Sequence, residues 1–218
     1  IPIFLSMVSL GISLVAQFIT PKALQDAWGD HGYELAIGLQ GLAGYVAVGD
    51  AGIQAYLTRH LALLHQRGDT SAFEKTVGAG LRALLLLGTG FGVLVVIAGL
   101  ATMRSPAQDS GEGAVAFIVT TVAGIVALAC GGFSTAVEYG LERYVRSQLF
   151  SLGRSVITGF GLPLLAVGNV SPMRALICVG LISILLDAAR FALARGLVPR
   201  SGGPPLPIRQ VLWEARGS

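Results

Sequence analysis

The sequence predicts an all-α membrane protein with six membrane-spanning helices. Only 12% of its 218 residues are charged, about half the share usual in soluble domains, and its mean hydropathy is +0.72. A membrane-spanning helix needs about 20 mainly apolar residues, and runs close to this length recur along the chain. The runs are long and continuous rather than alternating, which argues against the strands of a β-barrel.

Four of the six predicted spans contain no charged residue: residues 1–21, 83–103, 113–137 and 155–173. An aspartate divides each of the other two. The second span begins at Leu35 and continues past Asp50 to about Leu64, and the sixth runs from Ala175 past Asp187 to about Leu193. We therefore expect a six-helix bundle over residues 1–198. The Pro- and Gly-rich residues 199–218 are expected to form a cytoplasmic linker leading toward a second bundle.

The basic residues predict how this bundle is oriented. If the six spans alternate in direction, twelve of the fifteen lysines and arginines fall on one side of the membrane. Such an excess marks the cytoplasmic side, so both ends of the chain are expected to face the cytoplasm from the inner membrane. The opposite side carries only short loops, at residues 25–34, 104–112 and 169–174.

Several function classes have no support in the sequence. The basic residues are dispersed at the ends of apolar runs, which is unlike a nucleic-acid site. The histidines and cysteines have no metal-ligand spacing, and no catalytic or ATP-binding motif occurs. We therefore expect neither an enzyme nor a bound metal or cofactor.

Asp50 is the clearest candidate for coupling to a cation or proton, because charged groups within spans are usually functional. On a continuous helix it would share a polar stripe with Gln40, Gln54 and Thr58. The alternative is an aspartate that only packs against a neighbouring helix.

Three arginines are candidates for binding an anionic head group, Arg59, Arg82 and Arg154, because a guanidinium group can hold phosphate with two hydrogen bonds. The alternative is that each reaches the lipid head groups along its own helix.

Other charged residues are expected to be structural. Asp187 and Arg190, three residues apart, are expected to pair with each other. A solvated face is expected at the end of the fourth span, from Glu138, Glu142, Arg143 and Arg146.

The order of several motifs carries a family resemblance: Trp28-Gly-Asp-His-Gly-Tyr-Glu-Leu35, then Asp50-Ala-Gly52, Arg59 and Gly140-Leu-Glu-Arg-Tyr144. This succession resembles the polysaccharide-biosynthesis flippases of the multidrug/oligosaccharidyl-lipid/polysaccharide (MOP) exporter superfamily. It covers roughly residues 1–213. Glu34 departs from the pattern, where glycine is more usual, and so does the uncharged Gln17, which argues against the peptidoglycan-precursor subfamily.

The resemblance implies one lobe, the N-terminal half, of a two-lobed MOP/MATE-like transporter with twelve to fourteen helices. Its substrate would be an oligosaccharide on polyprenyl diphosphate, moved by alternating access through a cationic cleft. Arg59 and Arg143 match the family's basic positions, and Gln54 joins them as a candidate cleft residue. Glycan polymerases or glycosyltransferases are candidate partners. Two alternatives remain open: a cation-coupled multidrug exporter, and a non-transporting scaffold of a glycan-synthesis complex.

Overall fold

The computed structural model describes residues 2–46, 52–102 and 111–198, and the secondary structure of this part is helical, with no strand. The helices are α1 (Pro2–Gly44), α2 (Ile53–Gln66), α3 (Thr70–Thr102), α4 (Gly111–Val126), the π-helical turn η3 (Ala127–Gly131), α5 (Gly132–Gly140), α6 (Tyr144–Val167) and α7 (Pro172–Arg195). Because α4, η3 and α5 follow one another without a break, they act as one long element.

Five of the described elements are long and apolar enough to cross a membrane: Phe4–Gly41, Thr70–Gly99, Glu112–Gly140, Tyr144–Val167 and Pro172–Arg195. Many of their large apolar side chains are exposed, including Phe18, Leu94 and Leu164. Such surfaces suit contact with lipid rather than water. The chain is therefore a multi-pass, all-helical membrane protein.

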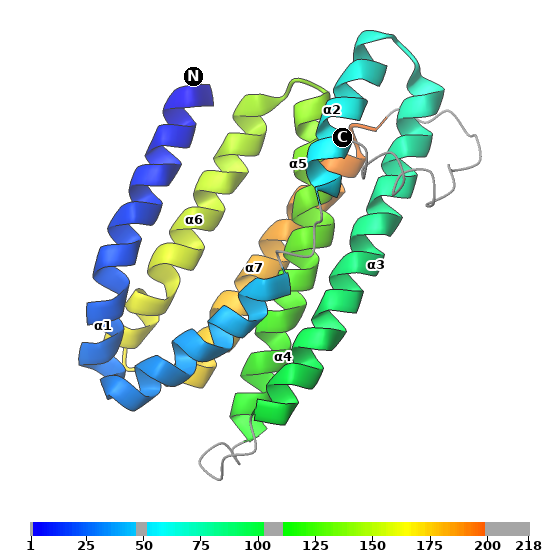
Figure 1. Ribbon diagram of the computed structural model, residues 1–218. Helices are drawn as coiled ribbons and strands as arrows, with labels where there is room; N and C mark the ends of the chain where they lie inside the picture. Colours follow the sequence, from blue (N-terminus) through cyan, green and yellow to red (C-terminus); the bar gives the residue numbers. More distant parts are fainter. Residues whose placement is uncertain (1, 47–51, 103–110, 199–218) are drawn as a thin grey trace.

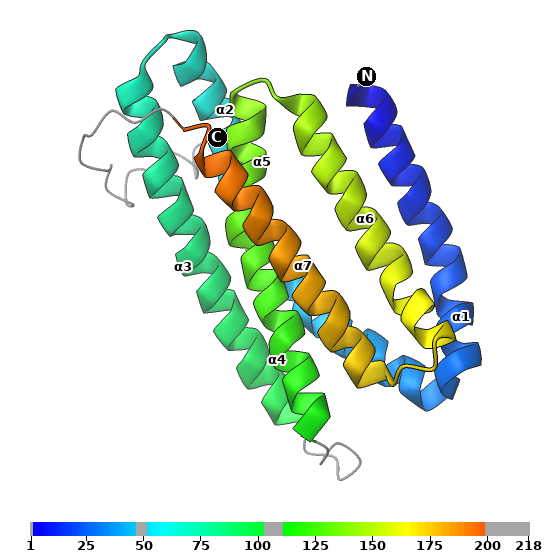
Figure 2. The same ribbon diagram turned by 180° about the vertical axis from the view of Figure 1, so that it is seen from behind.

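The long helices lie side by side in one bundle (Figures 1 and 2). The first part of α1 packs along α6 on one side, α2 and α3 lie on the other, and the α4–α5 element and α7 lie between them. The beginning of α1, the α2–α3 and α5–α6 turns and the end of α7 all lie at one end of the bundle, the upper end in Figure 1.

A bend at Gly29 divides α1 at the other end of the bundle. The φ of 69° and ψ of 174° at Gly29 belong to a region that glycine alone adopts readily. The indole Nε1 of Trp28 donates a hydrogen bond to the carbonyl of Val170 at 2.9 Å, and this bond stabilises the bend. The expectation of a loop over residues 25–34 was therefore wrong, because the chain reverses at a single glycine within helical surroundings.

The predicted second span is divided between two helices, so five elements instead of six meet the length and apolarity of a span. After Gly29, α1 runs obliquely back across the bundle, and α2 continues toward the upper end (Figure 1). Asp50 lies outside the described residues, and so does the predicted linker at 199–218. Other helices extend beyond the uncharged runs: α3 begins at Thr70 and α6 at Tyr144, because polar first turns can be helical without entering lipid.

The buried apolar side chains form two clusters. One joins α1, α3, α4, α6 and α7, and includes Leu24, Phe117 and Leu176. The other joins α2, α3, η3, α5 and the end of α7, and includes Leu61 and Phe73. The polar groups described next lie where α5, α6 and α7 meet.

Candidate functional site

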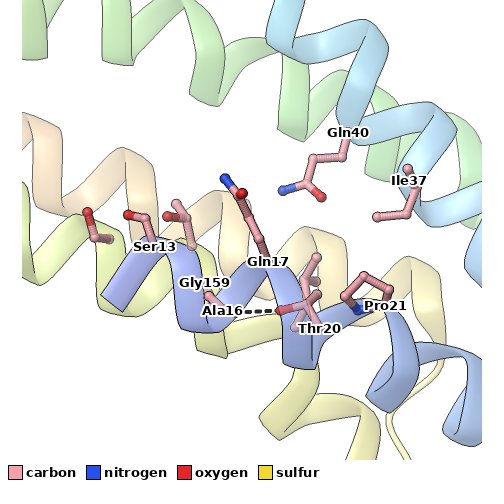
Figure 3. A pocket seen from close by; sticks show the side chains of 11 residues that line it. Ser13, Ala16, Gln17, Thr20, Pro21, Ile37, Gln40 and Gly159 are labelled. Atoms are coloured by element: carbon pink, nitrogen blue, oxygen red, sulfur yellow. Dashed lines mark hydrogen bonds between the residues drawn. The ribbon is translucent and has the colours of Figure 1, made fainter. Parts of the chain in front are cut away.

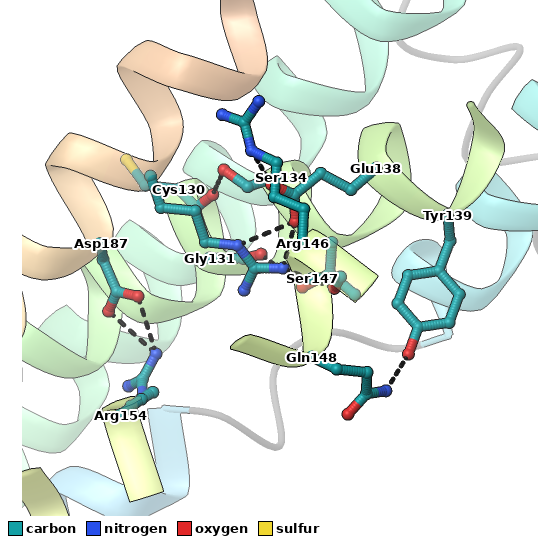
Figure 4. Close-up of polar contacts among 12 residues, drawn as sticks. Cys130, Gly131, Ser134, Glu138, Tyr139, Arg146, Ser147, Gln148, Arg154 and Asp187 are labelled. Atoms are coloured by element: carbon teal, nitrogen blue, oxygen red, sulfur yellow. Dashed lines mark hydrogen bonds and ion pairs between the residues drawn. The ribbon is translucent and has the colours of Figure 1, made fainter. Parts of the chain in front are cut away.

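A buried charged group, here called the Glu138 cluster, joins α5, α6 and α7 (Figure 4). Glu138 has no exposed surface, and its Oε2 accepts hydrogen bonds from Nε of Arg190 at 3.1 Å and from Nη2 at 2.6 Å. The same Nη2 donates to Oγ of Ser147 at 2.7 Å. Arg146 completes the cluster, with its Nε 3.3 Å from Oε1 of Glu138. One carboxylate thus bridges two guanidinium groups from two other helices.

This cluster corrects the expectation of a solvated face at the end of the fourth span. Glu138 and Arg190 are buried, whereas Glu142 and Arg143 are exposed in the α5–α6 turn. A carboxylate removed from water needs a close opposite charge, which Arg190 supplies from another helix. The cluster therefore holds three helices together through ion pairs and hydrogen bonds.

A second ion pair lies beside it, between Arg154 of α6 and Asp187 of α7. Nη1 of Arg154 donates to both carboxylate oxygens of Asp187, at 3.0 and 2.8 Å. The expected pairing of Asp187 with Arg190 was therefore wrong, because each side chain bonds to a residue of another helix. Since Asp187 occupies the Arg154 guanidinium, this arginine is not a free anion-binding group.

The glycine that ends the π-helical turn η3 leaves room for this pair. A Cβ added at Gly131, the last residue of η3, would lie 3.2 Å from Oδ1 of Asp187 and 3.4 Å from Nη1 of Arg154. Glycine therefore lets the ion pair lie against the backbone of the α4–α5 element. Such π-helical turns recur at functional sites and are points where a helix can bend.

We predict that removing the arginine of this pair destabilises the protein more than removing the aspartate. In Arg154→Met, the Asp187 carboxylate, whose side chain is only 4% exposed, loses its partner in a buried place. In Asp187→Leu, the Arg154 side chain, which is 36% exposed, can turn toward water. We expect a loss of roughly 2–3 kcal/mol for Arg154→Met and less for Asp187→Leu. Unfolding midpoints in detergent measure both; equal losses would contradict the prediction.

A groove lies between α2, α5 and the first turn of α6, and is called here the Arg59 groove. Its volume is about 620 Å³, and it is lined by Gln54, Ala55, Thr58, Arg59, Ala62, Thr135, Tyr139 and Tyr144. Arg59 is its only charged lining residue. The Arg59 side chain is exposed, and no described acidic side chain pairs with it.

Two tyrosines from α5 and α6, Tyr139 and Tyr144, line the same groove as Arg59. Nε2 of Gln148 donates a hydrogen bond to Oη of Tyr139 at 2.5 Å, and the Tyr139 and Tyr144 rings meet edge to face with centroids 5.2 Å apart. The Thr58 and Thr135 hydroxyls each donate to a backbone carbonyl four residues earlier, at 2.8 Å. The groove therefore presents one guanidinium group among hydroxyls and aromatic rings, which is a lining suited to an amphipathic anion.

Of the candidate substrate-binding residues, the structure places Arg59 and Gln54 together in this groove, beside Thr58 of the predicted polar stripe. Arg82 is exposed on α3, on the same face as Leu85 and Leu86, outside the groove. Arg143 is exposed in the α5–α6 turn. The polar stripe expected on one helix is also divided. Gln40 belongs to α1, whereas Gln54 and Thr58 belong to α2.

Sequence reasoning missed Thr135, Tyr139 and Tyr144 as groove residues, because only packing of α5 and α6 against α2 places them there. Among the residues that the structure describes, no group of three histidine, cysteine or acidic side chains could hold a metal ion.

Comparisons with known proteins do not identify a family for this chain. No protein-family model matches the sequence, and neither the search of curated proteins nor that of solved structures finds a match. The resemblance to MOP exporters therefore depends on the order of motifs in the sequence.

Proposed function

We propose that this protein is a transporter that moves an oligosaccharide or polysaccharide carried on polyprenyl diphosphate, whose diphosphate is the anionic part, across the cytoplasmic membrane by alternating access. The observation that carries the proposal is the Arg59 groove, an amphipathic groove whose one guanidinium group has no described acidic partner. A guanidinium group binds phosphate oxygens through two parallel hydrogen bonds. The lipid tail would remain in the bilayer beside the exposed apolar helix faces.

The distribution of charge supports loading from the cytoplasm. Basic residues of the described part gather in the elements at the upper end of the bundle in Figure 1: Arg59, Arg67, Lys75, Arg143, Arg146 and Arg195. We propose that this end is cytoplasmic, that the end of α1 and α2 together form the second of six crossings, and that the bundle corresponds to one MOP-like lobe. An anionic head group in the inner leaflet would then lie close to Arg59.

The helices also contain the bending points that alternating access needs. Pro21 and the break at Gly29 lie in α1, Pro163 lies in α6, and the π-helical turn η3 lies in the α4–α5 element. They would allow α1 and α6 to move relative to the α4–α5 element. Asp50 remains our candidate for coupling this movement to a cation or proton.

We predict that Arg59→Gln slows glycolipid transport at least about tenfold, since it removes charge-assisted hydrogen bonds to the diphosphate. The assay would use the full chain in proteoliposomes containing polyprenyl-diphosphate oligosaccharide, with a glycosidase detecting the sugar that reaches the outside. Arg82→Gln is the matched control, because Arg82 is also exposed but lies outside the groove. It should transport normally. Normal transport by Arg59→Gln would contradict the proposal and favour a drug exporter or a scaffold.

A further inference from the structure

A second cleft, here called the amide cleft, lies between the two parts of α1 and the middle of α6 (Figure 3). Its volume is about 380 Å³. No charged residue lines it. Its polar lining consists of hydroxyls and primary amides: Ser13, Gln17, Thr20, Gln40, Ser155 and Thr158. A diphosphate would find no opposite charge here, so this cleft differs in chemistry from the Arg59 groove.

Two glutamines face each other across this cleft. Gln17 lies before the Gly29 bend and Gln40 after it, and Figure 3 shows their amides directed toward one another. Both side chains are exposed in the cleft, and neither makes a described hydrogen bond. Since Ser155 and Thr158 lie halfway along the membrane-spanning α6, these amides are at the depth where lipid offers no hydrogen bonds. Their presence there indicates a polar ligand or water.

Two prolines add backbone acceptors to the same place. Proline has no N–H, so the carbonyl four residues before it loses its usual helical donor. Pro163 frees the carbonyl of Gly159, which accepts a hydrogen bond from Oγ1 of Thr20 at 3.0 Å (Figure 3). Pro21 frees the carbonyl of Gln17 in the same way, within the lining of the cleft.

From these features we infer that the amide cleft binds the uncharged sugar of the transported lipid. Primary amides and hydroxyls offer both donors and acceptors, as a sugar's hydroxyl groups require. Ala16, Ile37 and Leu162 provide apolar lining for the C–H faces of a sugar ring. This inference rests on the proposed function and assigns a second part of the same substrate.

The two clefts are placed along α6 in an order that fits one extended ligand. Tyr144 belongs to the Arg59 groove and Ser155 to the amide cleft, which is about 16 Å further along the helix axis. The diphosphate would lie at the charged end and the sugar nearer the middle of the bundle.

The test compares two lipids in nanodiscs containing the full chain: polyprenyl diphosphate bearing a neutral oligosaccharide, and bare polyprenyl diphosphate. Native mass spectrometry would measure the affinity of each. The double variant Gln17→Leu with Gln40→Leu should weaken binding of the sugar-bearing lipid about tenfold and leave the bare lipid unaffected. Gln66→Leu, in the last turn of α2 and outside both clefts, is the control and should change neither.

Equal affinities of the double variant and the unaltered protein for the sugar-bearing lipid would overturn the inference, and so would an equal loss for both lipids. Thr158→Val removes one hydroxyl at constant volume and should produce a smaller loss with the same selectivity. Arg59→Gln separates this inference from the proposed function. Suppose that Arg59→Gln still binds both lipids, while the double variant loses binding of the sugar-bearing lipid alone. The proposed diphosphate site at Arg59 would then be wrong, and the proposed sugar site in the amide cleft would be supported.

Discussion

Glu138→Gln is expected to destabilise the protein by at least about 3 kcal/mol, although the side chain keeps its size. Glu138 is the only described carboxylate that contacts Arg190 and Arg146, and Arg190 is itself buried. With a neutral amide at this position, the buried Arg190 charge loses the carboxylate that bonds to it. Because the three partners come from three helices, the loss should separate α5, α6 and α7. The unfolding midpoint of the purified protein in detergent measures the effect.

Two further variants show whether the loss of stability comes from the unpaired buried charge or from any substitution in this region. Glu142→Gln, in the exposed α5–α6 turn, should leave the midpoint unchanged. Glu138→Leu combined with Arg190→Met removes the pair together, and it should recover most of the stability because no buried charge remains unpaired. Arg146 stays in this variant. Its Nη2 is buried without a partner, but the side chain is 28% exposed, so the guanidinium group must rotate toward water for the stability to recover. If the Glu138→Gln protein were as stable as the unaltered chain, the ion pairs of the cluster would not be holding the three helices together.

The cluster also shows where prediction from sequence reaches its limit. Apolar runs predicted the five described elements that are long and apolar enough to span a membrane, but not the division of the second predicted span. Lipid selects length and hydropathy, which are local properties. Ion pairing is not local. Asp187 and Arg190 are neighbours on one helix, yet Asp187 bonds to Arg154 and Arg190 to Glu138. In a bundle, the charged group nearest in sequence competes with groups that only helix packing brings into reach.

In the candidate site, too, contacts within one helix could be predicted from the sequence, whereas contacts between helices could not. Gln54 and Arg59 were each candidate cleft residues in the sequence and belong to one helix, whereas Tyr139 joins them only through packing. In the sequence, Gln17 was only a departure from the family pattern and Gln40 only a member of a polar stripe. Their meeting depends on the Gly29 bend. The Trp28-Gly29 motif lay within a predicted loop, and a single glycine with positive φ cannot be distinguished from a loop by composition.

Packing of α2 against α5 is expected to fail when Gly140 is replaced with valine. A Cβ at Gly140 would lie 2.7 Å from Cβ of Leu61 and 3.4 Å from the backbone N of Ala62. The Leu61 Cβ is fixed to the backbone, so α2 itself would have to move. Overpacking of this kind destabilises by about 1–3 kcal/mol for a well-packed site, and valine should exceed alanine. Since α2 carries Arg59 and α5 carries Thr135, the Arg59 groove should widen at the same time.

Gly153 offers the matched control, because a Cβ there would meet no atom within 4 Å. Gly153→Ala should be neutral or stabilising, since alanine favours a helix by about 1 kcal/mol relative to glycine. Spin labels on α2 and α5 outside the contact would report the separation of the two helices, and the unfolding midpoint would report stability. An unchanged distance and midpoint in Gly140→Val would mean that α2 does not pack on α5 as described. If the distance increases and polyprenyl diphosphate binds more weakly, ligand binding in the groove requires α2 and α5 to be in contact. The reason is that Arg59 of α2 can bind a ligand held against Tyr139 of α5 only while the two helices stay close.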